Sequence, residues 1–125
     1  MKVATIYLAV GGFVTIGFGL AYLVRSRLMA RMVGMELRNA PARADYRSIY
    51  GGAQIAIGLF FCLAAWNASW RFAGLTALTL FAFGFGTTRL ASLAYERVGR
   101  DFQWLVGALE IVAGIVGVVL LVLRA

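Results

Sequence analysis

Four long apolar stretches limit most strongly what this chain of 125 residues can fold into. A helix needs about 20 consecutive apolar residues to cross a bilayer, and each stretch reaches that length. Their approximate bounds are 3–24, 46–66, 72–95 and 102–123. Hydrophobic residues make up 62% of the chain, well above the composition of soluble domains. The sequence therefore predicts an all-α polytopic membrane protein, a four-transmembrane-helix bundle that forms a single domain over residues 1–125.

Two other interpretations of these stretches fit the sequence less well. The first stretch is longer than the roughly 7–15 residues of a signal-peptide core, so we expect a transmembrane helix there. Phe81, Phe83 and Phe85 alternate with smaller residues, as in a strand. Because no alternating repeat of about ten residues recurs along the chain, a helix is expected and not a barrel strand.

The net charge of +7 comes from 12 basic and 5 acidic residues. Basic chains can bind nucleic acid. Here the arginines flank apolar stretches, so we expect them to meet anionic lipid headgroups and expect no nucleic-acid partner. The sequence has no histidine and one cysteine, Cys62. This excludes an intrachain disulfide, a cysteine–histidine zinc site and histidine-bound haem, and we expect no metal and no cofactor.

The connection over residues 25–45 is strongly basic. Within residues 25–39, arginines recur on one helical side, and apolar residues such as Leu28 and Met32 recur on another. Such spacing favours a helix that lies in the membrane interface. The arginines expected to contact anionic lipid there are Arg25, Arg27, Arg31 and Arg38. The alternative is a helical extension of the first transmembrane helix into the cytoplasm.

The next helix is expected to begin after Pro41, which interrupts the helical pattern. Asp45 follows at a position where a carboxylate can cap the N-terminus of a helix.

Most of the positively charged residues lie at one end of the predicted helices. Nine basic residues lie in the first and third connections or the helix ends beside them, against three on the other side, which are Lys2, Arg71 and Arg124. Because cytoplasmic connections carry the excess of basic residues, both termini are expected on the opposite side.

Glu110 is a carboxylate well inside an apolar stretch, about eight residues from its start and roughly 12 Å deep. A charge at such depth is costly and is kept mostly where it has a partner or a task. Gln54 lies at a similar depth, and Arg89 is near the same end of its own stretch. Arg47, Tyr50 and Gln54 are spaced to share one face of an α-helix. We therefore expect these five residues to form a buried polar cluster.

Two interpretations of the cluster stay open. In one, Glu110 is an anion, and either Arg89 or Arg47 is its counter-charge. Gln54 and Tyr50 are then the hydrogen-bonding groups around a small ligand, a lipid headgroup or a proton. In the other, the cluster is an ion pair that fixes helix order and rotation. Interhelical hydrogen bonds in membranes average only about 0.6 kcal/mol, so stability alone is a modest reason to retain it.

No catalytic motif accompanies the cluster, since the sequence lacks a histidine base, a Cys-x-x-Cys pair and a phosphate loop. We therefore expect no enzyme. The leading hypothesis is a small membrane protein that binds a lipid or small amphipathic ligand, or that serves as an accessory subunit. The alternative is a small proton-coupled transporter that acts as a dimer with Glu110 as proton carrier. Membrane lipids are the expected partners, together with a homodimer or a larger membrane complex.

The segment over residues 43–59 carries the most distinctive motif. Its members in chain order are Asp45, Arg47, Tyr50, Gly51, Gly52, Gln54 and Gly58. The segment resembles the domain-of-unknown-function 4345 family of small four-helix bacterial membrane proteins, which carry a similar tyrosine-glycine-glycine segment. Arg89 and Glu110 also resemble that family's pattern. The resemblance implies four helices in the bacterial inner membrane, where the charge distribution puts both termini in the periplasm, and it implies no activity.

Overall fold

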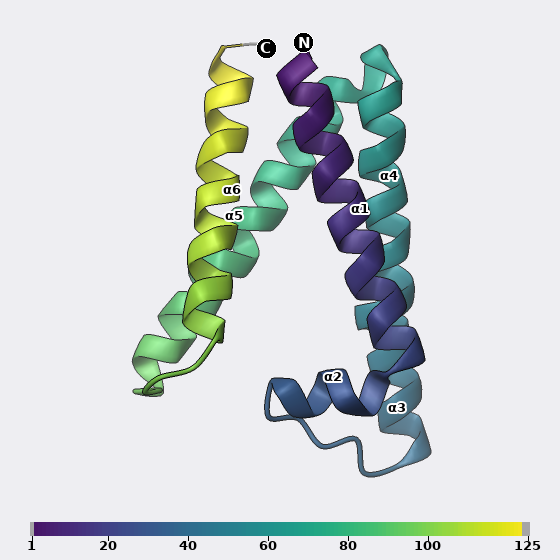
Figure 1. Ribbon diagram of the computed structural model, residues 1–125, viewed down its shortest axis with the longest axis vertical. Coiled ribbons are helices and arrows are strands. Elements are labelled where there is room, and N and C mark those ends of the chain that lie inside the picture. The colour runs from purple at the N-terminus through teal and green to yellow at the C-terminus, as the bar shows by residue number, and fades with distance from the viewer. Residues whose placement is uncertain (1, 124–125) are drawn as a thin grey trace. The chain divides into compact units, whose positions relative to one another are not determined.

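The computed structural model describes residues 2–123, so Arg124 of the charge count lies outside the described part. Helices account for its regular structure, and no strand occurs within these residues. In chain order they are α1 (Lys2–Val24), α2 (Ser26–Met32), α3 (Ala40–Tyr46), the π-helix η1 (Arg47–Ala53), α4 (Gln54–Trp66), the 3-10 helix η2 (Ala68–Trp70), α5 (Arg71–Tyr95) and α6 (Gln103–Val122) (Figure 1). The predicted all-α class is confirmed.

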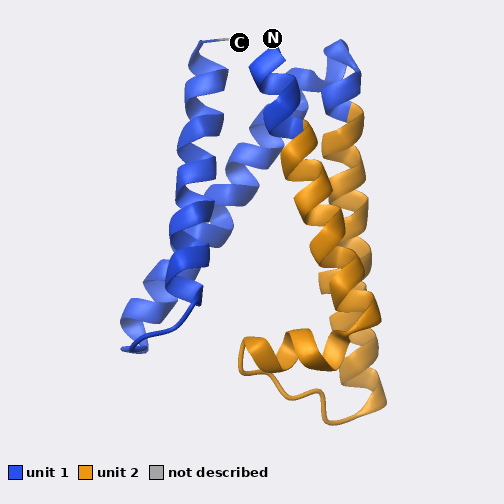
Figure 2. Cartoon of the chain, viewed as in Figure 1, with its two compact units in different colours: residues 1–8, 64–125 blue, residues 9–63 orange. Residues whose placement is uncertain are grey.

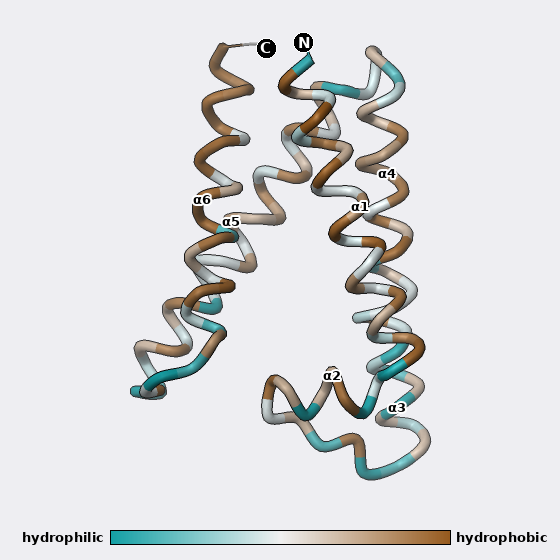
Figure 3. Tube along the Cα trace, viewed as in Figure 1, coloured by the Kyte–Doolittle hydropathy of each residue, from teal (hydrophilic) through white to brown (hydrophobic). Residues whose placement is uncertain are grey.

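Within the described residues, four helical runs are long and apolar enough to span a membrane. They are Lys2–Val24, Ala40–Trp66, Ala68–Tyr95 and Gln103–Val122. Hydrophilic residues gather at the ends of these runs and in the connections, while their middle parts are mostly apolar (Figure 3). Large apolar side chains such as Phe13 and Leu80 stay 70% and 67% exposed. Extensive exposed apolar surface of this kind suits contact with lipid.

The second run begins at Ala40, earlier than the predicted start at Tyr46. Its N-cap is Asn39, whose side-chain oxygen accepts a hydrogen bond from the backbone nitrogen of Ala42 at 2.8 Å. Pro41 lies in the first turn, where its missing N–H is not needed and its fixed φ fits a helix. The expectation that Pro41 precedes the helix and that Asp45 caps it is therefore wrong.

The chain folds into two compact units (Figure 2). Unit 1 contains residues 1–8 and 64–125, and unit 2 contains residues 9–63. Unit 1 thus holds the first turns of α1 with α5 and α6, and unit 2 holds the rest of α1 with α2, α3, η1 and most of α4. The single domain expected from the sequence stays a prediction.

In unit 2, α1 packs antiparallel to η1 and α4 through two glycine pairs. A Cβ added to Gly12 would lie 2.8 Å from the carbonyl oxygen of Gly58 and 2.5 Å from the sulfur of Cys62. A Cβ added to Gly19 would lie 2.9 Å from the carbonyl oxygen of Gly51. Main chains come this close only where side chains are absent, as in small-residue interfaces between helices in lipid.

In unit 1, α5 and α6 pack antiparallel along their length. A Cβ on Gly114 would lie 2.9 Å from the ring of Phe83, and Gly117 faces Thr79 in the same way. The first turns of α1 join this pair, because the hydroxyl of Tyr7 donates a hydrogen bond to the carbonyl oxygen of Ala113 at 2.8 Å. These contacts fix which faces of α5 and α6 meet, and so where their polar residues lie.

Candidate functional site

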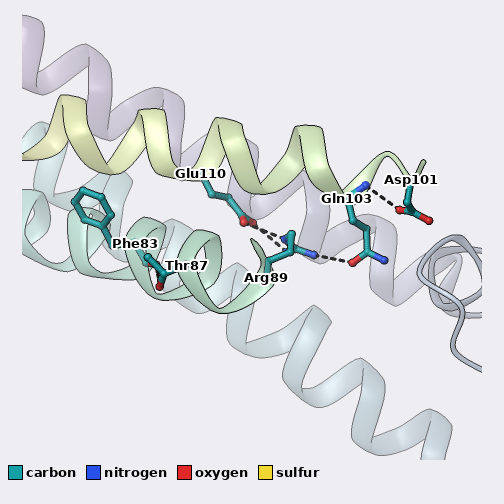
Figure 4. Close-up of polar contacts among 6 residues, drawn as sticks. All are labelled: Phe83, Thr87, Arg89, Asp101, Gln103 and Glu110. Carbon is teal, nitrogen blue, oxygen red and sulfur yellow. Dashed lines mark hydrogen bonds and ion pairs between the residues drawn. The ribbon is translucent and has the colours of Figure 1, made fainter. Parts of the chain in front are cut away.

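A bidentate ion pair joins α5 to α6 in unit 1 (Figure 4). The Nε atom of Arg89 donates to Oε2 of Glu110 at 3.0 Å, and its Nη2 atom donates to Oε1 at 3.0 Å. Two parallel hydrogen bonds between a guanidinium and a carboxylate are stronger and more directional than one. The side chains of Arg89 and Glu110 are 24% and 22% exposed. The pair is thus largely buried but keeps an accessible edge.

Gln103 at the start of α6 extends this pair. Its side-chain oxygen accepts a hydrogen bond from Nη1 of Arg89 at 3.2 Å (Figure 4). Its backbone nitrogen donates to the carboxylate of Asp101 at 2.9 Å, which supports the first turn of the helix. Gln103 was not among the residues predicted from the sequence. Its spacing of seven residues from Glu110, two turns along one face, is the signal that could have found it.

Two glycines, Gly107 and Gly86, allow α5 and α6 to approach closely beside the ion pair. A Cβ on Gly107 would lie 3.4 Å from Cδ of Arg89 and 2.6 Å from a methyl carbon of Leu90, so the arginine stem runs close along α6 at this point. A Cβ on Gly86 would lie 3.1 Å from Cβ of Glu110. Close approach of the two helices therefore brings the guanidinium within reach of both Glu110 and Gln103.

The other three predicted members of the cluster lie in unit 2. Arg47 and Tyr50 belong to the π-helix η1, and Gln54 begins α4. A π-helix is bonded from i to i+5, so the spacing rule of an α-helix does not hold across η1. Arg47 is exposed, whereas Tyr50 and Gln54 are half-buried. Their convergence on Glu110 stays a prediction.

Unit 2 contains an aromatic cluster that was not predicted from the sequence. The rings of Tyr46 and Tyr50 stack with centroids 4.6 Å apart, and the ring of Tyr22 meets them edge-on at 5.9 and 5.6 Å. Tyr46 is 3% exposed. Its hydroxyl is buried and has no hydrogen-bond partner in the described part of the chain. An unsatisfied buried hydroxyl lowers stability by about 1–3 kcal/mol.

The four arginines expected to contact anionic lipid are exposed. Arg25 separates α1 from α2, while Arg27 and Arg31 lie on α2. Arg38 follows α2, and its Nε atom pairs with Glu36 at 3.2 Å, with both side chains mostly exposed. Over residues 2–123, no group of three or more histidine, cysteine, aspartate or glutamate residues is placed to hold a metal ion.

The protein has four apolar helices, and an arginine–glutamate pair joins two of them. These features define an all-α protein of the membrane-spanning class. The chain belongs to the family described as Domain of unknown function (DUF4345), which matches residues 3–121. The resemblance seen in the sequence is thereby confirmed over nearly the whole chain. The family description assigns no activity. No curated protein and no solved structure matches the chain.

Proposed function

We propose that the chain is a non-enzymatic membrane protein that binds a lipid or a small amphipathic ligand at the Arg89–Glu110 pair. The observation that carries this proposal is an ion pair between two apolar helices. The side chains of Arg89 and Glu110 in this pair are 24% and 22% exposed. Ionisable groups inside membrane helices usually mark ligand or ion pathways. In the accessory-subunit version of the proposal, a polar group on a partner helix occupies the same edge.

The chemistry of the pair suits an amphipathic ligand with a polar head. Each carboxylate oxygen of Glu110 accepts one hydrogen bond from Arg89 and has further lone-pair capacity for a hydroxyl or ammonium group. Gln103 uses its side-chain oxygen for Arg89, and its amide nitrogen is a donor suited to an ester or phosphate oxygen.

Native mass spectrometry of the protein, released from mild detergent with its copurified lipids, tests this proposal. Wild type is expected to carry a bound lipid or amphiphile, and Arg89→Ala is expected to lose it. Arg100→Ala is the matched control, because Arg100 is an exposed arginine in the connection before α6. Retention of the same ligand by Arg89→Ala would refute the site. A pair that serves only packing predicts that Glu110→Gln lowers the thermal stability and leaves ligand binding unchanged.

A second candidate function is proton-coupled transport by a dimer, with Glu110 as the proton carrier. It is favoured by the engagement of both carboxylate oxygens with one guanidinium. A proton and Arg89 compete for the same carboxylate, so uptake of a proton would release the arginine and could drive a conformational change. Proteoliposome flux assays separate the candidates. Transport predicts a proton-coupled flux that Glu110→Gln abolishes while the protein stays folded, whereas the binding protein carries no such flux.

The proposed location is the bacterial inner membrane, with both termini in the periplasm. This rests on the nine basic residues at one end of the helices against three at the other and on the tendency of cytoplasmic connections to carry the basic excess. Membrane lipids and a second copy of the chain are the proposed partners.

A further inference from the structure

The chain changes direction at the end of α1, within unit 2. Helix α1 ends at Val24, and Arg25 has φ −124° and ψ 48°, outside the helical region. Helix α2 then runs across the direction of α1 (Figure 1). The alternative of a helical extension that continues the first transmembrane helix is therefore wrong. A helix that crosses the end of a membrane span is placed to lie along a membrane surface.

The side chains of α2 divide into three faces. Ser26 and Ala30 are 3% and 1% exposed, so this face packs against the protein. Leu28 and Met32, one turn apart on a second face, are 49% and 52% exposed. The third face carries exposed arginines, which are Arg27 and Arg31, again one turn apart. A helix with apolar and basic faces side by side, both uncovered, matches the interface between acyl chains and headgroups.

The segment of the chain that contains α2 carries four arginines besides Arg27 and Arg31. Residues 25–47 contain six arginines and two acidic residues. One of those acids, Glu36, is paired with Arg38. The segment over residues 25–47 thus carries a strong excess of guanidinium groups, the group that bonds phosphate oxygens in two-pronged geometry.

We propose that α2 is an in-plane anchor that binds anionic phospholipid. Leu28 and Met32 enter the acyl-chain region, and Arg27 and Arg31 bond headgroup phosphates beside them. Charge complementarity selects this occupant over a second copy of the chain, because two copies of this basic face would repel each other. The anchor lies on unit 2 and is independent of the function proposed for the Arg89–Glu110 pair.

Lipid selectivity of the full-length protein tests the basic face. Native mass spectrometry compares bound phosphatidylglycerol with phosphatidylcholine for wild type and for the double variant Arg27→Gln, Arg31→Gln. Each arginine removed is expected to weaken the preference for the anionic lipid about fivefold, since a basic residue near an anionic surface contributes about this factor. The matched control is Arg97→Gln, Arg100→Gln, which removes the same charge from exposed positions on unit 1 and should change the preference much less. An equal loss in both double variants would show that the preference follows net charge and would overturn the proposal.

Spin labels test the apolar face independently of affinity. Leu28→Cys and Arg27→Cys are labelled in a Cys62→Ala background and placed in nanodiscs that contain phosphatidylglycerol. The label at position 28 is expected to be reached by oxygen, which concentrates in lipid, and the label at position 27 by a water-soluble nickel complex. Nickel access at position 28 would place this face in water. Protection of position 28 from both reagents would show a protein partner, and spin–spin broadening would identify it as a second copy. Any of these three results would overturn the proposal.

Discussion

Glu110 accepts two hydrogen bonds from a single guanidinium, because Nε and Nη2 of Arg89 each lie 3.0 Å from a different carboxylate oxygen. The two residues come from different helices, α5 and α6. A two-pronged contact tolerates little rotation of either helix about its axis. The pair therefore fixes the register of α5 against α6 within unit 1.

Glu110→Gln should lower the free energy of unfolding by about 2 kcal/mol, since it leaves a mostly buried guanidinium without its anion. Thermal or denaturant unfolding in detergent micelles measures the loss. The control is Glu36→Gln, which breaks the exposed pair with Arg38; exposed pairs contribute little, so its stability should match wild type. Equal stability of the two variants would mean that the Arg89–Glu110 pair does not hold α5 and α6 together.

Gly12→Ala and Gly17→Ala should have opposite effects, although both positions lie on α1. At Gly12 a methyl group would meet the sulfur of Cys62 at 2.5 Å and the carbonyl oxygen of Gly58 at 2.8 Å. At Gly17 nothing lies within 4 Å. Overpacking should destabilise Gly12→Ala by about 1–3 kcal/mol, whereas alanine's higher helix propensity should leave Gly17→Ala neutral or slightly more stable. Unfolding curves of the two variants, measured under the same conditions, test this prediction. A Gly12→Ala variant as stable as wild type would contradict the close α1–α4 packing.

The fold was predictable from the sequence because each apolar stretch has the length of a membrane crossing. The residues at which the helices begin were less predictable. Pro41 can end one helical pattern or occupy the first turn of the next, and only the cap by Asn39 shows which occurs. The π-helix η1 was not predictable at all. It lies where Gly51 meets Leu23 and faces Gly19, and such contacts between distant residues leave no periodic signal in the local sequence.

For the site, an arginine partner for Glu110 was the predictable part, since an intramembrane carboxylate needs a cation. The sequence left open whether Arg89 or Arg47 is that partner, and the structure shows Arg89. Gln103 was not predicted because it lies at the start of α6, where a polar residue is ordinary and does not indicate a site. The grouping of Arg47, Tyr50 and Gln54 rested on α-helical spacing that η1 does not follow. Residue spacing thus predicts a shared helix face only where the helix type is uniform.

Cysteine accessibility tests the proposed orientation. In a Cys62→Ala background, Ala68→Cys lies in the connection before α5, and Gly99→Cys lies in the connection before α6, where a side chain meets nothing within 4 Å. If both termini are periplasmic, a membrane-impermeant maleimide added to intact cells should label position 68 and not position 99. Permeabilised cells serve as the control in which both should react. The reverse labelling pattern would contradict the orientation inferred from the basic residues.

Tyr46→Phe should stabilise the protein. The Tyr46 ring is buried and stacks on Tyr50, while its hydroxyl has no hydrogen-bond partner among residues 2–123. Phenylalanine keeps the ring and removes the unsatisfied group, so the free energy of unfolding should rise by about 1 kcal/mol. Tyr95→Phe is the matched control, because Tyr95 is 85% exposed and its stability should not change. Chemical denaturation of both variants in the same detergent measures the difference. A loss of stability in Tyr46→Phe would instead show that the hydroxyl bonds a water or lipid group in the membrane, which would make the tyrosine cluster a polar binding locus in its own right.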